Sequence, residues 1–413
     1  MCYICDMKRG IIIGIICLLS TMLYAQKVVV SGTVIDEQTG KRIPQASVSE
    51  VGSSVSVVTN DDGFFTIKLD GNMPAVTISH LGYQSRQVKI STAQTEPLRV
   101  RLKPTTIELK EVVVWTQDAR KLVDLAIQKI PQNYSSQPEL FNCFYRETAM
   151  KHQHYIYVAE GIVDMYKTPY NKKSSFRDRV AITKGRRLLS PKRGDTLSVK
   201  VIGGPVQPVK FDLVKNLDFL FNEAELNNYS FNLETSTVID GRPQFVVSIA
   251  PDKTLSYALF RGRLYIDCET LSFTRTELSL DMSDKNKATN SMLVHKPLGV
   301  RFKPKEMTML VDYKFDNGVT RISYIRSTFR FNCDWKRRLL ATSFTAFCEM
   351  VVTDRATHDV QPIQGNQSFD QRDAFYDRVD YFRDPDFWAD YNIIEPTETL
   401  DQAIGKLLKK YKN

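Results

Sequence analysis

The sequence predicts a mainly β protein in which a small antiparallel β-sandwich is followed by a larger α+β domain built on an antiparallel sheet. Two patterns favour this fold. Residues 28–102 contain about seven short apolar segments separated by turns rich in Gly and Asp, and residues 229–281 read as an antiparallel meander. With 42% apolar residues, including 22 Phe and 18 Tyr, the chain can fill the cores that both domains need.

The N-terminus has the features of a secretion signal. Lys8 and Arg9 precede an almost wholly apolar stretch, residues 10–23, and Ala25 supplies the small residue that a signal peptidase recognises. The stretch is shorter than the roughly 20 apolar residues of a spanning helix. We therefore expect residues 1–25 to be a signal peptide, cleaved after Ala25, and the mature protein to be exported.

The charge of the chain is mildly basic. The 56 Lys and Arg exceed the 47 Asp and Glu, for a formal net charge of +9. An exported protein meets anionic lipopolysaccharide, acidic glycans and lipid headgroups, so we expect no nucleic-acid partner. Solvated surface charge that maintains solubility is the simpler interpretation.

Four cysteines follow the signal region: Cys143, Cys268, Cys333 and Cys348. They are far apart in the sequence and lack C-x-x-C spacing, so they do not predict a zinc site. An oxidising compartment permits disulfides, and Cys333 with Cys348 could close a hairpin. Buried free thiols are an equally good interpretation.

The predicted sandwich contains the following strand-like segments: residues 28–35, 44–48, 64–67, 76–79, 83–85 and 98–102. Three motifs in this region, Gly32-Thr33-Val34, residues 60–65 (Asn-Asp-Asp-Gly-Phe-Phe) and residues 80–83 (His-Leu-Gly-Tyr), resemble the carboxypeptidase-regulatory-like domain. The resemblance implies a transthyretin-like sandwich over residues 26–103. Such domains occur at the N-terminus of exported Gram-negative envelope proteins, including TonB-dependent glycan transporters.

Residues 109–114 (Leu-Lys-Glu-Val-Val-Val) resemble the segment that follows this domain in those transporters, and we expect residues 104–117 to be a linker. About 300 residues remain, which are too few for the transporter barrel, so transport is not implied. The peptidase that gives the domain its name is also not expected, because no histidine has a Glu three residues later. Asp61-Asp62-Gly63 is interpreted as a plain hairpin turn and not as a calcium loop.

The second domain is expected over residues 118–395. Asp118 can cap a helix whose apolar residues recur at helical spacing until Pro131, which we expect to end it. Residues 141–146 and 154–161 are strand-like. Residues 167–200 contain eleven Lys or Arg, including Arg186 and Arg187, and are expected to form solvated loops around an edge strand.

The meander includes an Asp240-Gly241 turn and is followed by strands at residues 305–315 and 321–331. Residues 262–271 (Gly-Arg-Leu-Tyr-Ile-Asp-Cys-Glu-Thr-Leu) resemble sheet segments of periplasmic lipoprotein carriers. Those carriers wrap a hydrophobic ligand in an open half-barrel. The resemblance implies a concave half-barrel sheet that could hold an acyl chain or a strand of a partner.

The C-terminus combines an aromatic cluster with an amphipathic helix. Residues 386–396 contain Phe387, Trp388 and Tyr391, which we expect to dock onto the sheet. A capping box of Thr399 and Gln402 predicts a helix within residues 396–413. This ending resembles that of exported proteins that share the regulatory-like domain and have no established activity.

No catalytic, cofactor-binding or metal-binding residue is predicted. His152 and His154 would face the same side of one strand, but no third ligand can be assigned, so we interpret both as partly exposed strand residues. Asp267 and Glu269 have the residue type of a glycosidase pair, but acidic residues two apart are commonplace. Nucleophile-elbow, metalloprotease and phosphate-loop motifs are absent from the sequence.

The sequence therefore favours a non-enzymatic protein of the periplasm or outer membrane, in which the sandwich supports a β-rich domain that binds an envelope protein or glycan. One alternative is a carrier or chaperone that holds a lipid or lipoprotein on a curved sheet. The other is a hydrolase with an unrecognised site.

Overall fold

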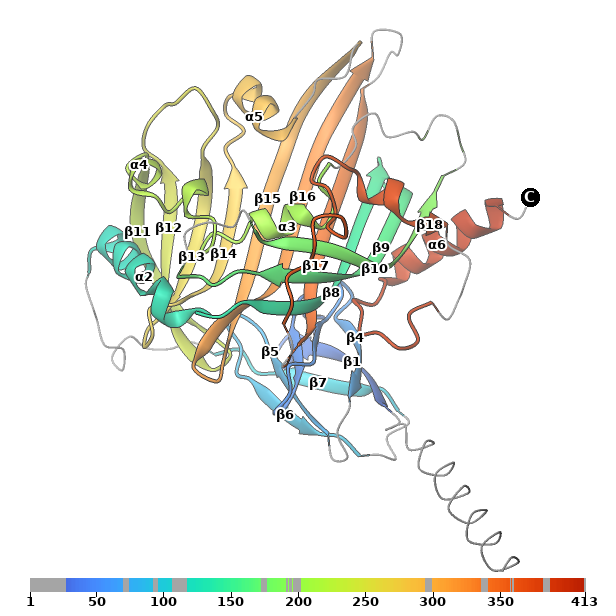
Figure 1. Ribbon diagram of the computed structural model, residues 1–413, viewed down its shortest axis with the longest axis horizontal. Helices are drawn as coiled ribbons and strands as arrows, with labels where there is room; N and C mark the ends of the chain where they lie inside the picture. Colours follow the sequence, from blue (N-terminus) through green and yellow to red (C-terminus); the bar gives the residue numbers. More distant parts are fainter. Residues whose placement is uncertain are drawn as a thin grey trace, which may run out of the picture.

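The computed structural model describes residues 27–411 except 70–73, 92–95, 106–116, 172–176, 191, 193–194, 196–201, 294–298, 336–340, 357, 359 and 382–386. The expected signal peptide and most of the expected linker lie outside these residues. The architecture is mainly β: an N-terminal sandwich lies against one large sheet, as Figure 1 shows.

Seven strands form the sandwich: β1 (Val28–Asp36), β2 (Ser47–Glu50), β3 (Ser56–Val58), β4 (Phe64–Leu69), β5 (Ala75–Ser79), β6 (Arg86–Lys89) and β7 (Leu98–Leu102). They make a three-stranded sheet in the order β4-β1-β7 and a four-stranded sheet in the order β3-β2-β5-β6. All pairs are antiparallel except β1 and β7, which are parallel. Residues 83–85, expected as a strand, precede β6 instead, and Tyr83 makes only an isolated bridge to Pro104.

Alternating residues of these strands fill the sandwich core. Val30, Phe65 and Val100 are buried in one apolar cluster, as a period of two residues requires for a sheet with one inward face. Gly32 has a steric role, because a Cβ there would lie 2.8 Å from the Leu98 carbonyl oxygen of the neighbouring strand.

The large sheet has eleven strands: β8 (Glu139–Lys151), β9 (His154–Lys167), β10 (Arg179–Leu189), β11 (Tyr229–Ile239), β12 (Arg242–Pro251), β13 (Phe260–Asp267), β14 (Phe273–Leu280), β15 (Val300–Asp316), β16 (Val319–Trp335), β17 (Thr342–Arg355) and β18 (Asp380–Tyr381). Its order is β11-β12-β13-β14-β15-β16-β17-β8-β9-β10-β18. β11 and β18 are therefore its two edges. The predicted meander is confirmed, and the Asp240-Gly241 turn has positive φ at both residues, as a tight hairpin needs.

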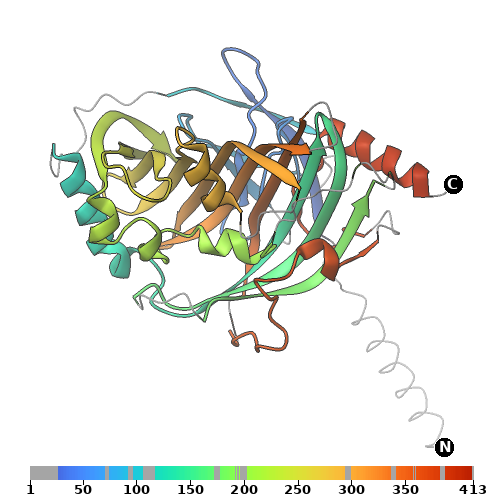
Figure 2. The same cartoon turned by 90° about the horizontal axis from the view of Figure 1, so that it is seen from above.

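The inner face of this sheet, which carries Tyr145 and Met350, is covered by the chain itself. Figure 2 shows the sheet curving, with α3 (Val206–Lys210) inside the curve and the sandwich on the opposite side. Helix α2 (Ala119–Asn133), α4 (Glu223–Leu226), α5 (Lys285–Met292) and a strap of residues 369–379, which contains the short helix η4 (Phe375–Arg378), contribute to the same core.

Helix α2 is capped as predicted, since the Asp118 side chain accepts a hydrogen bond from the Lys121 amide at 3.1 Å. The expectation that Pro131 ends it is wrong, because the helix continues to Asn133. A proline in the last turn removes only its own amide, and the Tyr134 amide closes the turn by donating to the Ile130 carbonyl oxygen.

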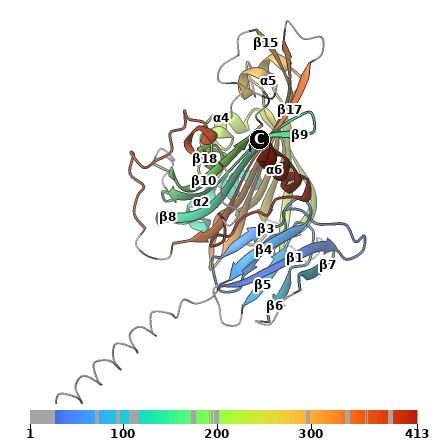
Figure 3. The same ribbon diagram turned by 90° about the vertical axis from the view of Figure 1, so that its right-hand side faces the viewer.

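The outer face, which carries Phe144 and Val351, holds the sandwich and the C-terminal segment (Figure 3). Trp388 packs edge-on against Phe144, which confirms the expected docking of the aromatic cluster on the sheet. Helix α6 (Glu398–Tyr411) follows and packs Leu400, Ile404 and Leu407 onto β9 and β10. Across the described residues, every helix is too short or too polar to span a bilayer.

Candidate functional site

A row of charged residues crosses the outer face at right angles to the strands. The strand register places, in order, Arg263, Glu277, Leu310, Arg326, Glu349, Arg146, Glu160 and Arg186 directly opposite one another. Cβ atoms of directly opposed residues lie about 5 Å apart. Opposite charges therefore alternate across the sheet, interrupted within this row by Leu310. We call these eight residues the charged row.

One end of the charged row is buried under the C-terminal segment. Glu160 is 1% exposed, and its two carboxylate oxygens bind the guanidinium groups of Arg146 at 2.7 Å and Arg186 at 3.1 Å. The Trp388 indole N–H also donates to Glu160, at 3.2 Å. Burial raises the pKa of Glu160, but the two arginines outweigh it and keep this pKa below its usual value. The carboxylate is therefore ionised and structural.

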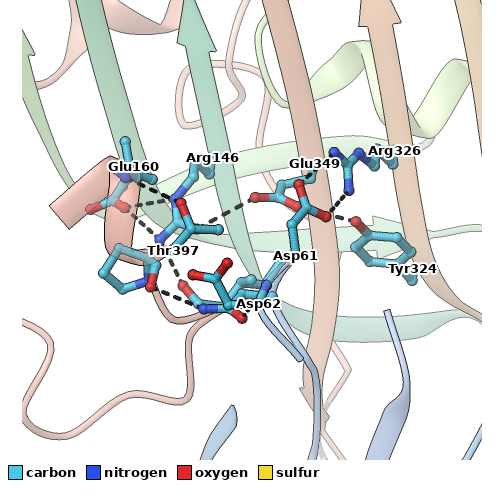
Figure 4. A network of polar contacts seen from close by, with 12 residues as sticks. Asp61, Asp62, Arg146, Glu160, Tyr324, Arg326, Glu349 and Thr397 are labelled. Carbon is cyan, nitrogen blue, oxygen red and sulfur yellow. Dashed lines mark hydrogen bonds and ion pairs between the residues drawn. The ribbon is translucent and has the colours of Figure 1, made fainter. Parts of the chain in front are cut away.

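The centre of the row is bound by the sandwich. Asp61 accepts two hydrogen bonds from Arg326, at 2.7 and 3.0 Å (Figure 4). Asp62 accepts the Glu398 amide at 2.7 Å, and the Asn60 side-chain amide donates to the Pro396 carbonyl oxygen at 3.0 Å. The turn expected at Asp61-Asp62-Gly63 thus also joins the sandwich, the sheet and the start of α6.

A small polar cavity of about 50 Å³ lies beside this junction, between His80 of the sandwich and Asp312 of β15. It has room for a few water molecules at most. Burial, with Arg275 nearby, lowers the pKa of His80 to about 4, and burial raises the pKa of Asp312 to about 6. Arg275 pairs with Asp312 at 3.0 Å, so this charge network also belongs to the interface.

The other end of the charged row is open and borders a groove of about 670 Å³ between the sandwich residue Gln45 and the outer face of the sheet. The floor is the next cross-strand row, formed by Arg261, Ser279, Thr308, Thr328 and Phe347. Lining residues run from β11 to β17, which are six interstrand spacings or roughly 29 Å.

Charged side chains flank this floor on both sides. Arg263 pairs with Glu234 at 2.8 Å, and Arg330 pairs with Glu306 at 3.0 Å. All four side chains remain at least one-third exposed. The groove therefore offers hydroxyl, guanidinium and carboxylate groups together on one surface.

The inner face also buries polar groups, and in two clusters they bind one another. Lys167 pairs with Asp212 at 2.6 Å, and Tyr170 and Tyr313 donate to the same carboxylate. Glu147 accepts a hydrogen bond from Tyr145 at 2.8 Å, and burial raises the pKa of Glu147 to about 7. Both clusters lie within the packed core.

The strap covers Glu147 and fits the inner face closely. A Cβ at Gly161 would lie 2.7 Å from Phe375, and a Cβ at Gly204 would lie 2.8 Å from the same residue. These contacts indicate that the glycines make room for the strap. The strap is therefore part of the folded structure that fills the curve of the sheet.

The two histidines considered as a metal pair do not share a strand face. His152 lies in the turn between β8 and β9 with a positive φ, and His154 begins β9 and is exposed. The interpretation of both as strand residues is therefore wrong for His152, because a two-residue hairpin occupies this position. The described residues contain no group of three or more side chains suited to a metal ion.

Asp267 and Glu269 both pair with Arg242, at 2.6 and 2.9 Å. Burial raises the pKa of Asp267, but hydrogen bonds from Arg242 and Thr270 outweigh it and keep this pKa below its usual value. Asp267 also accepts the Glu269 amide at 3.0 Å. These carboxylates organise a turn.

Cys143, Cys268, Cys333 and Cys348 are all buried free thiols. Cys333 and Cys348 do not close a hairpin, because Cys348 lies opposite Ser327, six residues along β16 from Cys333. That offset corresponds to roughly 20 Å, far beyond the reach of a disulfide.

Part of the expected basic loop is a strand. Arg186 and Arg187 lie on β10, where Arg186 is 9% exposed and bound to Glu160. The charged row was not predicted, because its members come from strands that are distant in sequence. The alternation of polar and apolar residues along each strand indicates which side chains lie on the outer face. Only the strand register shows that the charged ones lie opposite one another in one row.

Comparisons with known proteins identify one part of the chain. Residues 30–114 match the family described as the CarboxypepD_reg-like domain. The chain matches no curated protein.

Three solved structures show remote similarity. A DUF1329 family protein from Desulfovibrio piger is 12% identical, with a TM-score of 0.23, over 57% of this chain and 94% of that chain. A LolA superfamily protein from Nitrosomonas europaea is 13% identical, with a TM-score of 0.20, over 60% and 96%. A protein of unknown function from Bacteroides fragilis is 10% identical, with a TM-score of 0.16, over 80% and 99%.

The sandwich motifs, the seven described strands and the family match agree with one another. Residues 30–114 are a carboxypeptidase-regulatory-like domain.

Proposed function

We propose that this chain is a non-enzymatic binding protein of the Gram-negative envelope, exported to the periplasm or the outer membrane. In this proposal the groove on the outer face holds a polar ligand, either a glycan or a polar segment of an envelope protein. The sandwich acts as a support that forms one wall of the groove.

The observation that carries the proposal is the difference between the two faces of the large sheet. The inner face is filled by helices and by the strap, whereas the outer face leaves an open groove across seven strands. Because the sheet satisfies its own backbone hydrogen bonds along these strands, a ligand lying across them has to be recognised by side chains.

The side chains of the groove suit such a ligand. Ser279 and Thr308 provide hydroxyl groups that both donate and accept hydrogen bonds. Arg263 and Glu306 carry opposite charges at the flanks, and Phe347 offers an aromatic surface at one end. Apolar side chains also line the groove, and this mixture suits a glycan or a polypeptide segment.

The carrier alternative requires an apolar site large enough for a lipid tail. The apolar residues of the inner face are instead in contact with α2, α3 and the strap. A lipid would have to displace these segments. The filled inner face therefore favours the groove on the outer face as the binding site.

The composition of the groove supports a binding role without catalysis. Its lining residues include neither histidine nor cysteine, and its carboxylates Glu234, Glu277 and Glu306 are each ion-paired with an arginine. This composition supports the proposal of binding without a general base or an activated nucleophile.

Purification of the protein from its own envelope, followed by mass spectrometry of bound material, tests the proposal. The test variant is Thr308→Trp, which places an indole on the groove floor. The matched control is Ser291→Trp, at an exposed position of α5. We expect a glycan or polypeptide to accompany the wild type and the control in stoichiometric amount, and the Thr308→Trp variant to lose it.

A stoichiometric lipid that remains bound to the Thr308→Trp variant would instead establish the carrier. Recovery of the unprocessed chain from the cytosol would remove the envelope assignment altogether. Fractionation of cells, with N-terminal sequencing to locate the cleavage site after Ala25, measures this second point.

A further inference from the structure

A group of basic side chains lies on the last two strands of the sandwich. The acidic turn residues Asp61 and Asp62 of the sandwich face the large sheet and α6, as described above. Arg86 and Lys89 of β6, with Arg99, Arg101 and Lys103 on and after β7, are all exposed. Five cations therefore lie on or next to the last two strands of the sandwich.

The strand order puts these basic residues on the edge strands opposite β3 and β4, although the segment before β6 contacts the large sheet, where the Gly82 amide donates to the Val238 carbonyl oxygen of β11 at 2.8 Å. β3 contacts β17, and Lys68 of β4 donates to the Trp388 carbonyl oxygen of the C-terminal segment at 2.7 Å. β6 and β7 are the opposite edges of the same two sheets, and they lie on the side of the sandwich away from the large sheet in Figure 1.

Four of the five cations are close together, and Lys89 lies three residues along β6 from Arg86. Arg99, Arg101 and Lys103 are two residues apart, so they project from the same side of β7 at intervals of roughly 7 Å. Val100 and Leu102, which alternate with them, are buried in the core. The Arg86 guanidinium donates to the Arg101 carbonyl oxygen at 3.1 Å, which brings the β6 edge against the β7 edge.

These cations differ from the arginines of the large sheet. In the part of the chain that the structure describes, none of the five pairs with a carboxylate, whereas arginines around the groove do: Arg261 with Asp281, Arg263 with Glu234, Arg326 with Asp61 and Arg330 with Glu306. The basic edge therefore keeps its charge available for an external anion.

We propose that this basic edge, formed by Arg86, Lys89, Arg99, Arg101 and Lys103, docks on the phosphate headgroups of an anionic lipid surface. A two-stranded array of unpaired cations matches a plane of negative charge, which attracts each nearby Lys or Arg. Docked in this way, the protein turns the large sheet and its groove away from the membrane.

Charged edge strands also prevent edge-to-edge aggregation, and this role has to be separated from lipid docking. Reversal of charge separates the two roles. Glutamate prevents edge-to-edge pairing as lysine or arginine does, but anionic lipid repels it. The test variant is Arg99→Glu/Arg101→Glu. Both side chains are exposed, so the core of the sandwich is left intact.

A matched control is Arg301→Glu/Lys305→Glu, which reverses two exposed charges on β15. These residues lie at the opposite end of β15 from Lys314, which donates to Ser49 of the sandwich. The control therefore changes the net charge equally but far from the basic edge.

The measurement is flotation of residues 26–413 with phosphatidylcholine vesicles that contain either no anionic lipid or about 30% phosphatidylglycerol. We expect the wild type and the control to bind only the anionic vesicles, with binding lost at high salt because of screening. The Arg99→Glu/Arg101→Glu variant is expected to bind at least tenfold more weakly.

Equal binding of the test variant and the control would overturn the proposal, as would the absence of wild-type binding to anionic vesicles. Retention on an acidic polysaccharide column without vesicle binding would assign the edge to glycans. Circular dichroism melting of all three proteins verifies that each is folded. The result is independent of the groove, whose ligand is tested with the Thr308→Trp variant.

Discussion

Glu147 illustrates how a single side chain depends on the segment that covers it. Its carboxyl group lies on β8 under the strap, close to Tyr145, Tyr157 and Cys348. Burial raises the pKa of Glu147 from 4.5 to about 7, against the opposing effect of the two tyrosine hydroxyl groups. The packed strap is therefore most compatible with the protonated acid.

This arrangement predicts a stability that falls as pH rises. A raised pKa means that the folded protein holds the proton more tightly than the unfolded chain, so the contribution is fully present below pH 4.5 and is lost as pH rises through about 7. In the wild type, the free energy of unfolding should fall by up to about 3 kcal/mol between pH 4.5 and 8. Chemical denaturation over this range should show that Glu147→Gln removes this fall.

The control for this measurement is Glu306→Gln, because Glu306 is partly exposed and pairs with Arg330 at the surface. Its pH profile should parallel that of the wild type. If Glu147→Gln also keeps the wild-type slope, the carboxyl group is not protonated beneath the strap.

Among the elements, the C-terminal helix shows that a local capping pattern can misplace the start of a helix. The sequence predicted a cap at Thr399, which is wrong. The structure begins the helix at Glu398, and the Thr397 hydroxyl accepts the Leu400 amide at 3.1 Å. Both threonines are plausible caps by residue type, but the Asp62 contact at the Glu398 amide fixes the earlier start. A contact from the other domain thus decides the boundary.

This difference between two neighbouring threonines can be measured. We expect Thr397→Ala to destabilise α6 by about 1 kcal/mol, the usual cost of losing a cap, and to speed hydrogen exchange in its first turn. Thr399→Ala removes an exposed side chain without a cap bond, so exchange should stay close to that of the wild type. The opposite ranking would restore the cap that the sequence predicted.

The strands were predicted better than their partners. Alternation of apolar residues located β8, β9 and the meander from β11 to β14, and the turn residues Asp240 and Gly241 fixed a hairpin. Nothing in the local sequence indicates that β17 pairs with β8. That pairing depends on the packing of the complete inner face. Without knowledge of the pairing, the order of the residues in the charged row cannot be predicted.

At the scale of the whole molecule, the sandwich and the sheet share one interface core. Val58 of β3 is buried with Phe144, Tyr324 and Trp388, which come from β8, β16 and the C-terminal segment. The Ser56 hydroxyl also donates to the Val352 carbonyl oxygen at 2.7 Å. The two parts should therefore unfold together.

Differential scanning calorimetry tests this cooperativity. The wild type is expected to show one transition. Val58→Asp buries an unpaired carboxylate at the interface, which costs several kcal/mol, and should separate the unfolding of the sandwich from that of the sheet. Val51→Asp is the control, because Val51 is 47% exposed in the same sandwich. Two transitions in the wild type would contradict the shared interface.

The pairing of β8 with β17 has a consequence for biosynthesis. β8, β9 and β10 emerge from the ribosome early, yet the strand that attaches them to the rest of the sheet arrives only near residue 355. Until then their hydrogen-bonding edge is unsatisfied, and pairings between segments so remote in sequence form slowly. These three strands are therefore expected to remain unattached to the rest of the sheet for most of the synthesis of the chain.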